Sequence, residues 1–325
     1  MQGLNDLSQR FPEQISVKEF EPLSRHTRFG LGGPARLMVD VEDSSVLPEV
    51  VTALKTSGLP VITLGGGSNL IVADSGFDGI VLRFTGKQIT RHDSITTAES
   101  GVVWQHLVDF HNDLALAGME RMTGIPGWLG GALYGNAGAY GQTIMDFVES
   151  VRVFNGAGFE DIANADCQFA YRTSGFKSRK DWILLSARIR LTPGDPIEIR
   201  QTSNEILTTR NEKFPPTMKC AGSIFKNLFV ADLPGKALNR VPQGIMRAGK
   251  VPSAWFLEQV GSKGMKVGGI EVAPYHANLI YNTGDGTAAE VCQLIDTLKQ
   301  RVFAEFDLQL EEEVQYVGFP DRLSH

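Results

Sequence analysis

The sequence has few cysteines, no long apolar run and no excess of basic residues, and each shortage argues against a class of protein. Its three cysteines, Cys167, Cys220 and Cys292, lie far apart and form no CxxC pair. This argues against a disulfide framework or a zinc site and indicates reduced thiols in a cytoplasmic protein. No stretch approaches the roughly 20 apolar residues that span a bilayer, and the first residues lack the pattern of a signal peptide.

The balance of charge also narrows the choice of partners. The chain has 37 acidic and 31 basic residues and a net charge of −6. Because no basic excess is present to neutralise phosphates, nucleic acid is not expected as the main partner. The 325 residues, 42% of them apolar, are enough for two or three packed domains.

Glycine, in contrast, is concentrated in two segments. Residues 124–141, GIPGWLGGALYGNAGAYG, hold seven glycines around an isolated polar Asn136. So much glycine disfavours a core strand or a helix interior and suits a close approach of backbone to a flat or charged ligand. In residues 63–72, TLGGGSNLIV, a short apolar strand is followed by three consecutive glycines. The backbone N–H groups of these glycines could surround an anion such as a pyrophosphate. Two tight surface loops are the alternative, but two such segments favour a nucleotide-type ligand.

The order of apolar patterns predicts an α+β protein in three parts. The sequence Pro193-Gly194-Asp195-Pro196 is the strongest boundary signal. The predicted domains are 1–85, 86–195 and 196–325. The predicted helices are 44–57, 102–118, 198–212, 253–261 and 287–306. The predicted strands include 60–67, 79–84, 148–155, 183–191 and a final strand over 307–319, which would place Leu308, Leu310, Val314 and Tyr316 on one face and Glu313 on the other.

Six motifs together resemble one family, the UDP-N-acetylenolpyruvoylglucosamine reductases. They cover nearly the whole chain and follow the family order, which makes the resemblance specific although each motif alone is weak. The motifs are HTRFGLGGPA (26–35), LGGGSNLIV (64–72), GIPGWLGGALYGNAGAYG (124–141), YRTSGFK (171–177), AGSIFKN (221–227) and LEEEV (310–314).

The resemblance implies a fold, a reaction and a location. The fold would be a three-domain flavoprotein of the vanillyl-alcohol-oxidase type, with FAD held non-covalently by the first two domains and the UDP-sugar bound by the C-terminal one. NADPH would reduce FAD, and the flavin N5 hydride would then reduce the enolpyruvyl double bond of UDP-N-acetylglucosamine enolpyruvate to give UDP-N-acetylmuramate. This step of peptidoglycan precursor synthesis serves cell-wall biogenesis, cell shape and division. The enzyme would be a cytoplasmic monomer without membrane insertion.

The resemblance assigns three catalytic residues, and each also has a simpler interpretation. Ser223 matches the serine that protonates the α-carbon, although a serine after glycine is usually a turn residue. Arg172 matches an arginine that stabilises the developing charge, although an arginine in a loop is usually solvated. Glu313 matches a glutamate that acts as an acid or as part of the charge network, although acidic residues also protect exposed strand edges. The six motifs in order favour the functional interpretation.

Binding residues are transferred from the family motifs in the same way. A covalent flavin link is not indicated, because GGGSN contains no His or Cys. The residues expected at the FAD are Gly65, Gly66, Gly67, Ser68, Asn69, Ile125, Gly130, Gly131, Asn136, Ala137 and Gly138. Those expected at the UDP-sugar are Lys213 and Asn227, followed by Tyr171, Glu258 and His276; Lys213 could equally be a surface lysine.

The sequence departs from the family pattern in two places. Many members carry a serine two residues before the histidine that corresponds to His276. This sequence has Pro274 at that position, followed by Tyr275, which places the local substrate contacts in doubt. One branch also carries a loop with a tyrosine that closes over the UDP-sugar. Here about 20 residues separate Lys177 from the next predicted helix, and none is Tyr, so a more open substrate site without this lid is expected.

Two other functions remain open at the level of sequence. A flavin oxidase or dehydrogenase of the same fold would need the glycine-rich segments but not Ser223, Arg172 and Glu313 together. A non-catalytic nucleotide-sugar binder would have lost at least one of these three residues, and all three are present.

Overall fold

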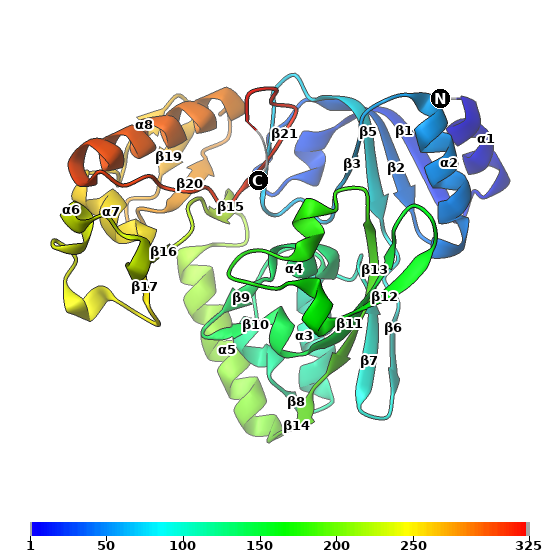
Figure 1. Cartoon of the computed structure of the whole chain (residues 1–325), viewed down its shortest axis with the longest axis horizontal. Coiled ribbons are helices and arrows are strands. Elements are labelled where there is room, and N and C mark those ends of the chain that lie inside the picture. The colour runs from blue at the N-terminus through cyan, green and yellow to red at the C-terminus, as the bar shows by residue number, and fades with distance from the viewer. Residues whose placement is uncertain (1, 323–325) are drawn as a thin grey trace. The chain divides into compact units, whose positions relative to one another are not determined.

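The computed structural model describes residues 2–322 (Figure 1). The chain divides into two compact units, and the division is not a simple cut along the sequence. The first unit comprises the residues up to Glu21, Ala35–Gly67 and Asp78–Pro215. The second comprises Pro22–Pro34, Ser68–Phe77 and the chain from Pro216 onward. Two short segments from the first quarter of the sequence therefore belong with its last third.

The first unit begins with a four-stranded sheet covered by two helices. Buried Leu37, Val39 and Ile80 of the sheet share a hydrophobic core with Leu47 and Val50 of the second helix. The strand order is β1-β2-β5-β3, and β3 runs parallel to β5. The elements are α1 (Gln2–Arg10), β1 (Ile15–Pro22), β2 (Pro34–Val41), α2 (Leu47–Ser57), β3 (Val61–Thr63) and β5 (Phe77–Phe84).

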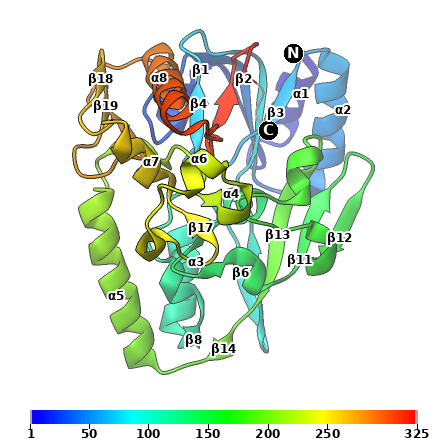
Figure 2. The ribbon, with the colours of Figure 1, turned by 60° about the vertical axis from the view of Figure 1, so that its left-hand side comes forward.

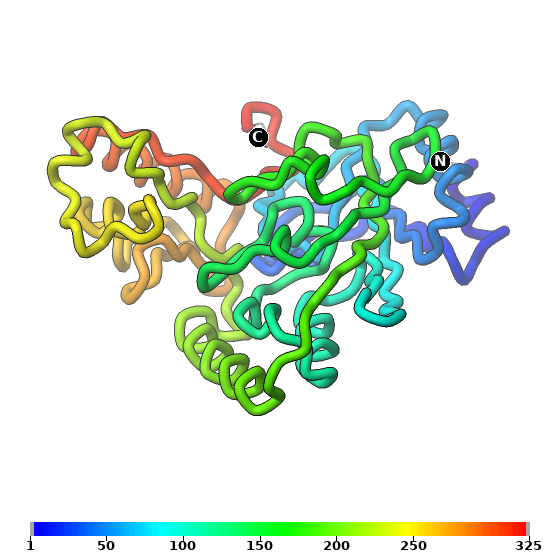
Figure 3. The backbone as a smooth tube through the Cα atoms, turned by 60° about the horizontal axis from the view of Figure 1, so that its bottom comes forward, coloured from blue at the N-terminus to red at the C-terminus, as the bar shows by residue number. Residues whose placement is uncertain are grey.

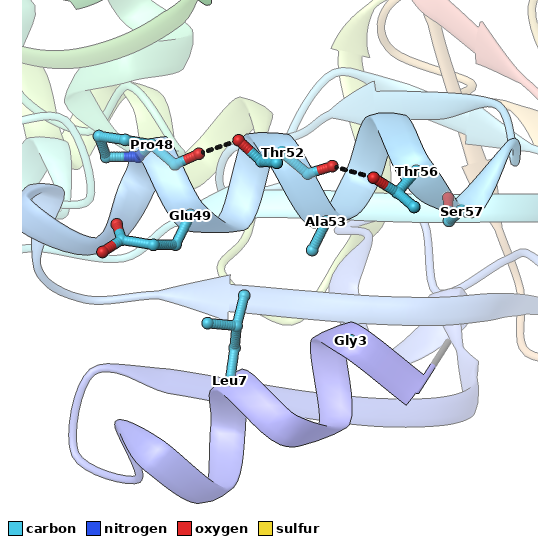
Figure 4. A pocket seen from close by; sticks show the side chains of 8 residues that line it. All are labelled: Gly3, Leu7, Pro48, Glu49, Thr52, Ala53, Thr56 and Ser57. Atoms are coloured by element: carbon cyan, nitrogen blue, oxygen red, sulfur yellow. Dashed lines mark hydrogen bonds between the residues drawn. The ribbon is translucent and has the colours of Figure 1, made fainter.

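A groove of about 500 Å³ lies between α1 and α2 (Figure 4). Leu7 of α1 and Ala53 of α2 line it. The hydroxyl of Thr52 donates to the carbonyl oxygen of Pro48 at 2.7 Å, and that of Thr56 donates to Thr52 at 2.9 Å. None of the residues that the sequence assigns to the site lines this groove.

The rest of the first unit is built on a five-stranded antiparallel sheet (Figure 2). Its order is β12-β11-β13-β7-β6. In β13, Ile183, Leu185, Ala187 and Ile189 are buried and alternate with more exposed residues, which is the half-buried pattern that the sequence predicts for 183–191. The main elements are β6 (Ile89–His92), β7 (Ile95–Glu99), α3 (Trp104–Asp113), α4 (Leu129–Gly135), β11 (Val148–Phe154), β12 (Phe159–Ala163), β13 (Ile183–Arg190) and α5 (Pro196–Lys213). Two-residue strands add the pairs β8 (Leu116–Ala117) with β14 (Thr192–Pro193), and β9 (Gly138–Ala139) with β10 (Gln142–Thr143).

Helix α5 belongs to the first unit, although the sequence analysis places residues from 196 onward in a third domain (Figure 3). Asp195 caps the helix by accepting from the backbone N–H of Ile197 at 2.7 Å. The buried Ser203 hydroxyl accepts from Asn112 of α3 at 3.2 Å and lies 2.7 Å from the Thr123 hydroxyl. These contacts join α5 to the residues of the second predicted domain.

The second unit is a four-stranded antiparallel sheet packed with helices. Its order is β15-β20-β19-β18. The predicted helix over 287–306 is confirmed by α8 (Ala288–Phe306), in which Val291, Leu294, Ile295, Leu298 and Val302 are all buried. The elements are β4 (Leu70–Val72), β15 (Lys219–Ser223), β16 (Leu228–Phe229), α6 (Gly235–Leu238), β17 (Lys250–Val251), α7 (Ser253–Gln259), β18 (Lys266–Val267), β19 (Ile270–Val272), β20 (Leu279–Asn282), α8 (Ala288–Phe306) and β21 (Gln315–Val317).

The final strand is much shorter than predicted. The sequence indicates a strand over 307–319, whereas β21 covers only Gln315–Val317 and pairs in parallel with β4. Leu308, Leu310 and Val314 are buried as expected. The residues before β21 form only a single bridge, between Phe225 and Glu312. They therefore reach the core without a continuous ladder, and Glu313 precedes the strand instead of lying within it.

Residues 2–322 contain no membrane-spanning helix, no metal-binding cluster and no paired cysteines. No helix in this part of the chain is both long enough and apolar enough to cross a bilayer. No three His, Cys, Asp or Glu side chains in it are arranged to hold a metal ion. Cys167, Cys220 and Cys292 are buried free thiols.

His111 of α3 is a buried ionisable group whose burial has a measurable consequence. Its side chain is fully buried, and its Nε2 lies 3.0 Å from the Thr96 hydroxyl. Burial, with a smaller contribution from the charge of Arg91, lowers the pKa of His111 from 6.5 to about 4. Below pH 6.5 the unfolded chain therefore binds a proton that the folded chain does not bind.

We expect His111 to make the protein less stable in acid. Its contribution is fully present above about pH 6.5 and is lost as the pH falls towards 4, on the order of 3 kcal/mol in total. In His111→Gln, urea unfolding should show a smaller loss of stability across this window than wild type. His106→Gln, an exposed change on the same helix, should keep the wild-type dependence. An unaltered pH dependence in His111→Gln would show that another group causes the effect.

Candidate functional site

The first glycine-rich segment follows β3 and exposes bare backbone. Among the described residues, no hydrogen-bond partner is found for the backbone N–H groups of Gly65, Gly66 and Gly67. Gly67 has a φ of 63°, which side-chain-bearing residues rarely adopt. A Cβ on Gly65 would lie 3.7 Å from the backbone nitrogen of Gly131. The structure thus brings the two glycine-rich segments together within the first unit, as a ligand contacted by both would require.

Gly66 is held against an aromatic ring that is itself supported by an ion pair. A Cβ on Gly66 would lie 2.8 Å from Cδ1 of Trp128, so only glycine fits. The guanidinium of Arg83 lies 5.5 Å from the centre of the Trp128 ring. Arg83 donates from Nε and Nη2 to the two carboxylate oxygens of Asp40, at 2.6 and 2.8 Å. Trp128 and this bidentate pair therefore fix one side of the loop from strands β2 and β5.

The second glycine-rich segment contains a helix, which corrects the prediction that so much glycine would exclude one. Helix α4 spans Leu129–Gly135, with Leu129, Ala132 and Leu133 buried. Burial of these three side chains outweighs the low helix propensity of the three glycines. Asn136 ends the helix with a φ of 43°. It is buried, and its Nδ2 donates to the carbonyl oxygen of Ala170 at 2.8 Å.

Arg172 lies close to this helix end. Its Nη2 donates to the carbonyl oxygen of Gly138 at 3.0 Å, and its guanidinium lies 5.3 Å from the centre of the Tyr171 ring. Its backbone has a φ of 55°, and its carbonyl oxygen accepts from Nζ of Lys177 at 2.9 Å. The structure therefore brings the predicted residues Asn136, Gly138, Tyr171 and Arg172 into one region of the first unit. The left-handed backbone and these bonds hold the arginine in a defined place.

Ser223 and Glu313 come together in the second unit. Ser223 is half-buried at the end of β15, after an irregularity in the pairing with β20 that includes Gly222 with a φ of 78°. The backbone N–H of Glu313 donates to the carbonyl oxygen of Ile224 at 2.7 Å. Glu313 is also half-buried. Residues that are 90 positions apart in the sequence are thus fixed side by side through their backbones, with Ile224 directly following Ser223.

The three consecutive glutamates of LEEEV have different environments. Glu311 forms an ion pair with Lys226, and both carboxylate oxygens of Glu312 lie 3.0 Å from Nζ of Lys299. The backbones of all three lie against residues 224–226: the N–H of Lys226 donates to the carbonyl oxygen of Glu311 at 3.0 Å, Glu312 forms a bridge with Phe225, and Glu313 is bonded to Ile224, the residue directly after Ser223.

Asn278 is a supporting residue that the sequence analysis missed. It is buried, and its side chain accepts from the N–H of Phe225 at 2.9 Å and donates to the carbonyl oxygen of Phe225 at 2.8 Å. Its Nδ2 also donates to the hydroxyl of Ser253 at 2.8 Å. This network fixes the turn that follows Ser223. Its only signal in the sequence is an asparagine two residues after His276, which does not reveal its partner.

The residues predicted at the UDP-sugar are less closely grouped. Tyr171 and Lys213 lie in the first unit, with Lys213 exposed at the end of α5, while Asn227, Glu258 and His276 lie in the second. Asn227 is exposed and its side-chain oxygen accepts from the N–H of Ser253 at 3.3 Å. Glu258 is exposed and pairs with Lys263 at 2.7 Å. His276 is half-buried, and its Nδ1 accepts from the N–H of Asn278 at 3.3 Å.

The predicted site residues fall into two sets, one in each unit. The first unit offers bare backbone from both glycine-rich segments and a fixed guanidinium, which suits a cofactor with an anionic part and a substrate with a developing negative charge. The second unit offers a hydroxyl and a carboxylate held by backbone hydrogen bonds, which suits a proton donor and its partner. The bare backbone fits FAD, which has both a pyrophosphate and a flat ring.

Family models match two parts of the chain. Residues 35–159 match a family described as an FAD binding domain. Residues 214–317 match the C-terminal domain of UDP-N-acetylenolpyruvoylglucosamine reductase. The predicted FAD-binding part and separate C-terminal part are thus found in the predicted order.

Whole-chain comparisons give the same result. A UDP-N-acetylenolpyruvoylglucosamine reductase of Solibacter usitatus is 52% identical over 304 residues, covering 94% of this chain and 97% of that protein. One from Carboxydothermus hydrogenoformans is 33% identical and covers 96% and 98%. The crystal structure of the reductase from Thermus caldophilus superposes with a TM-score of 0.73 at 28% identity, covering 94% of this chain and 99% of that one. The predicted fold class is confirmed.

We expect Gly66→Ala to weaken FAD binding, because the added Cβ would displace either the loop or Trp128. Overpacking of this kind costs about 1–3 kcal/mol, or roughly tenfold or more in the dissociation constant for FAD. Titration of the apo-protein by flavin fluorescence would measure it. Gly158→Ala, where a Cβ would meet nothing within 4 Å, is the matched control. Wild-type affinity in Gly66→Ala would contradict this account of the loop.

Proposed function

Because the chain belongs to the UDP-N-acetylenolpyruvoylglucosamine reductase family, we propose that Ser223, Arg172 and Glu313 carry out the reaction for which that family is named. The chain is a flavoprotein oxidoreductase that uses FAD and takes its reducing equivalents from NADPH. It reduces the enolpyruvyl group of UDP-N-acetylglucosamine enolpyruvate to UDP-N-acetylmuramate, a step of peptidoglycan precursor synthesis. When bound, FAD supplies the hydride that is added to the β-carbon.

The glycine-rich segments hold the cofactor in this proposal. Gly65, Gly66 and Gly67, continued by Ser68 and Asn69, would surround the pyrophosphate with backbone N–H groups. The proposal is supported by the contact between Gly65 and Gly131 and by the fit of Gly66 to Trp128. The remaining FAD residues come from the segment around α4, namely Ile125, Gly130, Gly131, Asn136, Ala137 and Gly138. The buried hydrogen bond of Asn136 would keep that backbone in place.

Ser223 donates the proton to the α-carbon. A serine hydroxyl is a weak acid, so this role requires strong pre-organisation. The observation that carries the proposal is the 2.7 Å hydrogen bond from the N–H of Glu313 to the carbonyl oxygen of Ile224, which fixes the carboxylate-bearing residue beside Ser223. Glu313 would assist as an acid or through its charge.

Arg172 stabilises the negative charge that develops on the substrate carboxylate. A guanidinium stays protonated and can form two hydrogen bonds with a carboxylate. Its contacts with Gly138 and Tyr171 support a fixed position near the predicted FAD residues of the same unit.

The finer parts of the assignment are proposals as well. Lys213 and Asn227 would hold the UDP group, and Tyr171, Glu258 and His276 would line the substrate pocket. We propose the domains 1–85, 86–195 and 196–325, with α5 of the last one packed on the second through Ser203. The enzyme would act as a monomer in the cytoplasm. The buried free thiols support the cytoplasmic location.

An anaerobic visible spectrum of Ser223→Ala tests the proton donor. We expect this variant to bind FAD, and NADPH to bleach its flavin band as in wild type, since no proton for the substrate is needed in that half-reaction. Added UDP-N-acetylglucosamine enolpyruvate should then restore the band at least about 100-fold more slowly than in wild type, which is the lower end of a general acid's usual contribution.

Wild type run in parallel is the control for both half-reactions. Rapid recovery in Ser223→Ala would exclude Ser223 as the donor. Bleaching of wild type by NADPH without recovery on adding the substrate would instead favour a flavin oxidase or dehydrogenase of the same fold.

A further prediction concerns the tyrosine lid over the substrate. Residues 178–195, between Lys177 and α5, contain β13 and β14 but no tyrosine. A strand of the central sheet thus occupies the region where a lid-bearing branch of the family has its extra loop. We expect a crystal structure of the enzyme with its UDP-sugar to show no tyrosine closed over the UDP group as a lid. A closed tyrosine lid in that complex would disprove the open site.

A further inference from the structure

Asn69 is the last residue of the GGGSN sequence, where a role at the cofactor is the natural expectation. The structure gives its side chain another partner. Its Nδ2 donates to the carbonyl oxygen of Glu313 at 2.9 Å, across a separation of 244 residues. Because a carbonyl oxygen only accepts hydrogen bonds, this contact also fixes which end of the amide faces Glu313.

The backbone of Asn69 strengthens the same connection. Its carbonyl oxygen accepts from the N–H of Gln315 at 3.0 Å, directly before β4 and β21 begin to pair. The two hydrogen bonds therefore enclose Val314, one on each side. The side chain of Gln315 adds a longer contact of 3.4 Å to the same carbonyl oxygen of Glu313.

Glu313 is thus held from two directions within the second unit. Asn69 binds its carbonyl oxygen, while its own N–H donates to the carbonyl oxygen of Ile224, the residue after Ser223. A continuous set of hydrogen bonds runs from Asn69 through Glu313 to the segment of the proposed proton donor. Rotation of the peptide groups on either side of Glu313 would break one of these bonds.

We propose that Asn69 is a positioning residue for Glu313, and so couples the cofactor loop to the proton-transfer step. This rests on the proposed function, in which Glu313 acts beside Ser223. The amide of Asn69 has a second N–H bond and an oxygen, so a cofactor contact remains compatible with this role. Loss of the Asn69 amide should therefore slow the proton-transfer step that uses Glu313, in addition to any effect on the affinity for FAD.

Half-reactions of the holoenzyme separate the two effects. Asn69→Ala at saturating FAD should be reduced by NADPH at a rate within about twofold of wild type, because Glu313 is not used in that step. Its reoxidation by UDP-N-acetylglucosamine enolpyruvate should be about 10- to 100-fold slower, the usual effect of a small misplacement of a catalytic group. The pH profile of reoxidation should also shift, because the surroundings of the Glu313 carboxyl change. Asn239→Ala, at an exposed asparagine of the same unit, should leave both rates unchanged.

Glu313→Gln and the double variant complete the test. If Asn69 acts through Glu313, adding Asn69→Ala to Glu313→Gln should slow reoxidation by no more than about twofold further. Full multiplication of the two single effects would overturn the inference. Equal slowing of both half-reactions in Asn69→Ala would also overturn it and leave Asn69 as a cofactor contact alone.

The two proposals fail in different ways. Wild-type reoxidation in Glu313→Gln would remove Glu313 from the mechanism, and the positioning role of Asn69 with it. Slow reoxidation in Glu313→Gln together with wild-type behaviour in Asn69→Ala would refute the inference and leave the proposed function intact.

Discussion

The parallel pairing of β4 with β21 is the interaction on which the placement of Glu313 depends. It joins Leu70–Val72 to Gln315–Val317, and parallel pairing can only join segments that the chain brings back from a distance. Asp74, a few residues further on, accepts hydrogen bonds from the N–H groups of Ala288 and Ala289 at 2.8 and 3.0 Å and so caps α8. The ten residues 68–77 therefore anchor both the helix and the segment that carries Glu313.

The sequence identifies candidate residues for the site better than it predicts the architecture around them. The two glycine-rich segments are visible from composition, whereas Ser223, Arg172 and Glu313 are transferred from the family resemblance and their roles stay predictions. The assignment of residues 68–77 to the second unit is not visible in the sequence. Local patterns group this segment with the strand before it, since they report periodicity and turns but not which distant strand completes a sheet.

Two of the incorrect element predictions have the same physical origin. Helix α4 forms despite Gly130, Gly131 and Gly135 because three buried side chains supply what helix propensity lacks. Instead of a strand over 307–319, only β21 forms, because Gln315–Val317 are the residues of this segment that pair in a continuous ladder with another strand. In both cases packing with residues far away in the sequence decides the outcome. The buried amide of Asn278 was missed for this reason too, since its partner Phe225 is 53 residues away.

The way in which the two sets of residues are held differs, and this bears on how much substitution each tolerates. In the first unit, the loop at Gly66 depends on side chains, namely Trp128, Arg83 and Asp40, so a change in any of them reaches the backbone directly. In the second, Glu313 is fixed mainly through backbone groups, which every residue except proline supplies. Each such bond contributes only about 1 kcal/mol. The backbone of Glu313 is therefore placed by several weak bonds to different segments, and the side chain of Asn69 makes the shorter of the two side-chain contacts described for its carbonyl oxygen. We expect this backbone to keep its geometry through most substitutions near Glu313 and to be most sensitive to substitution of Asn69.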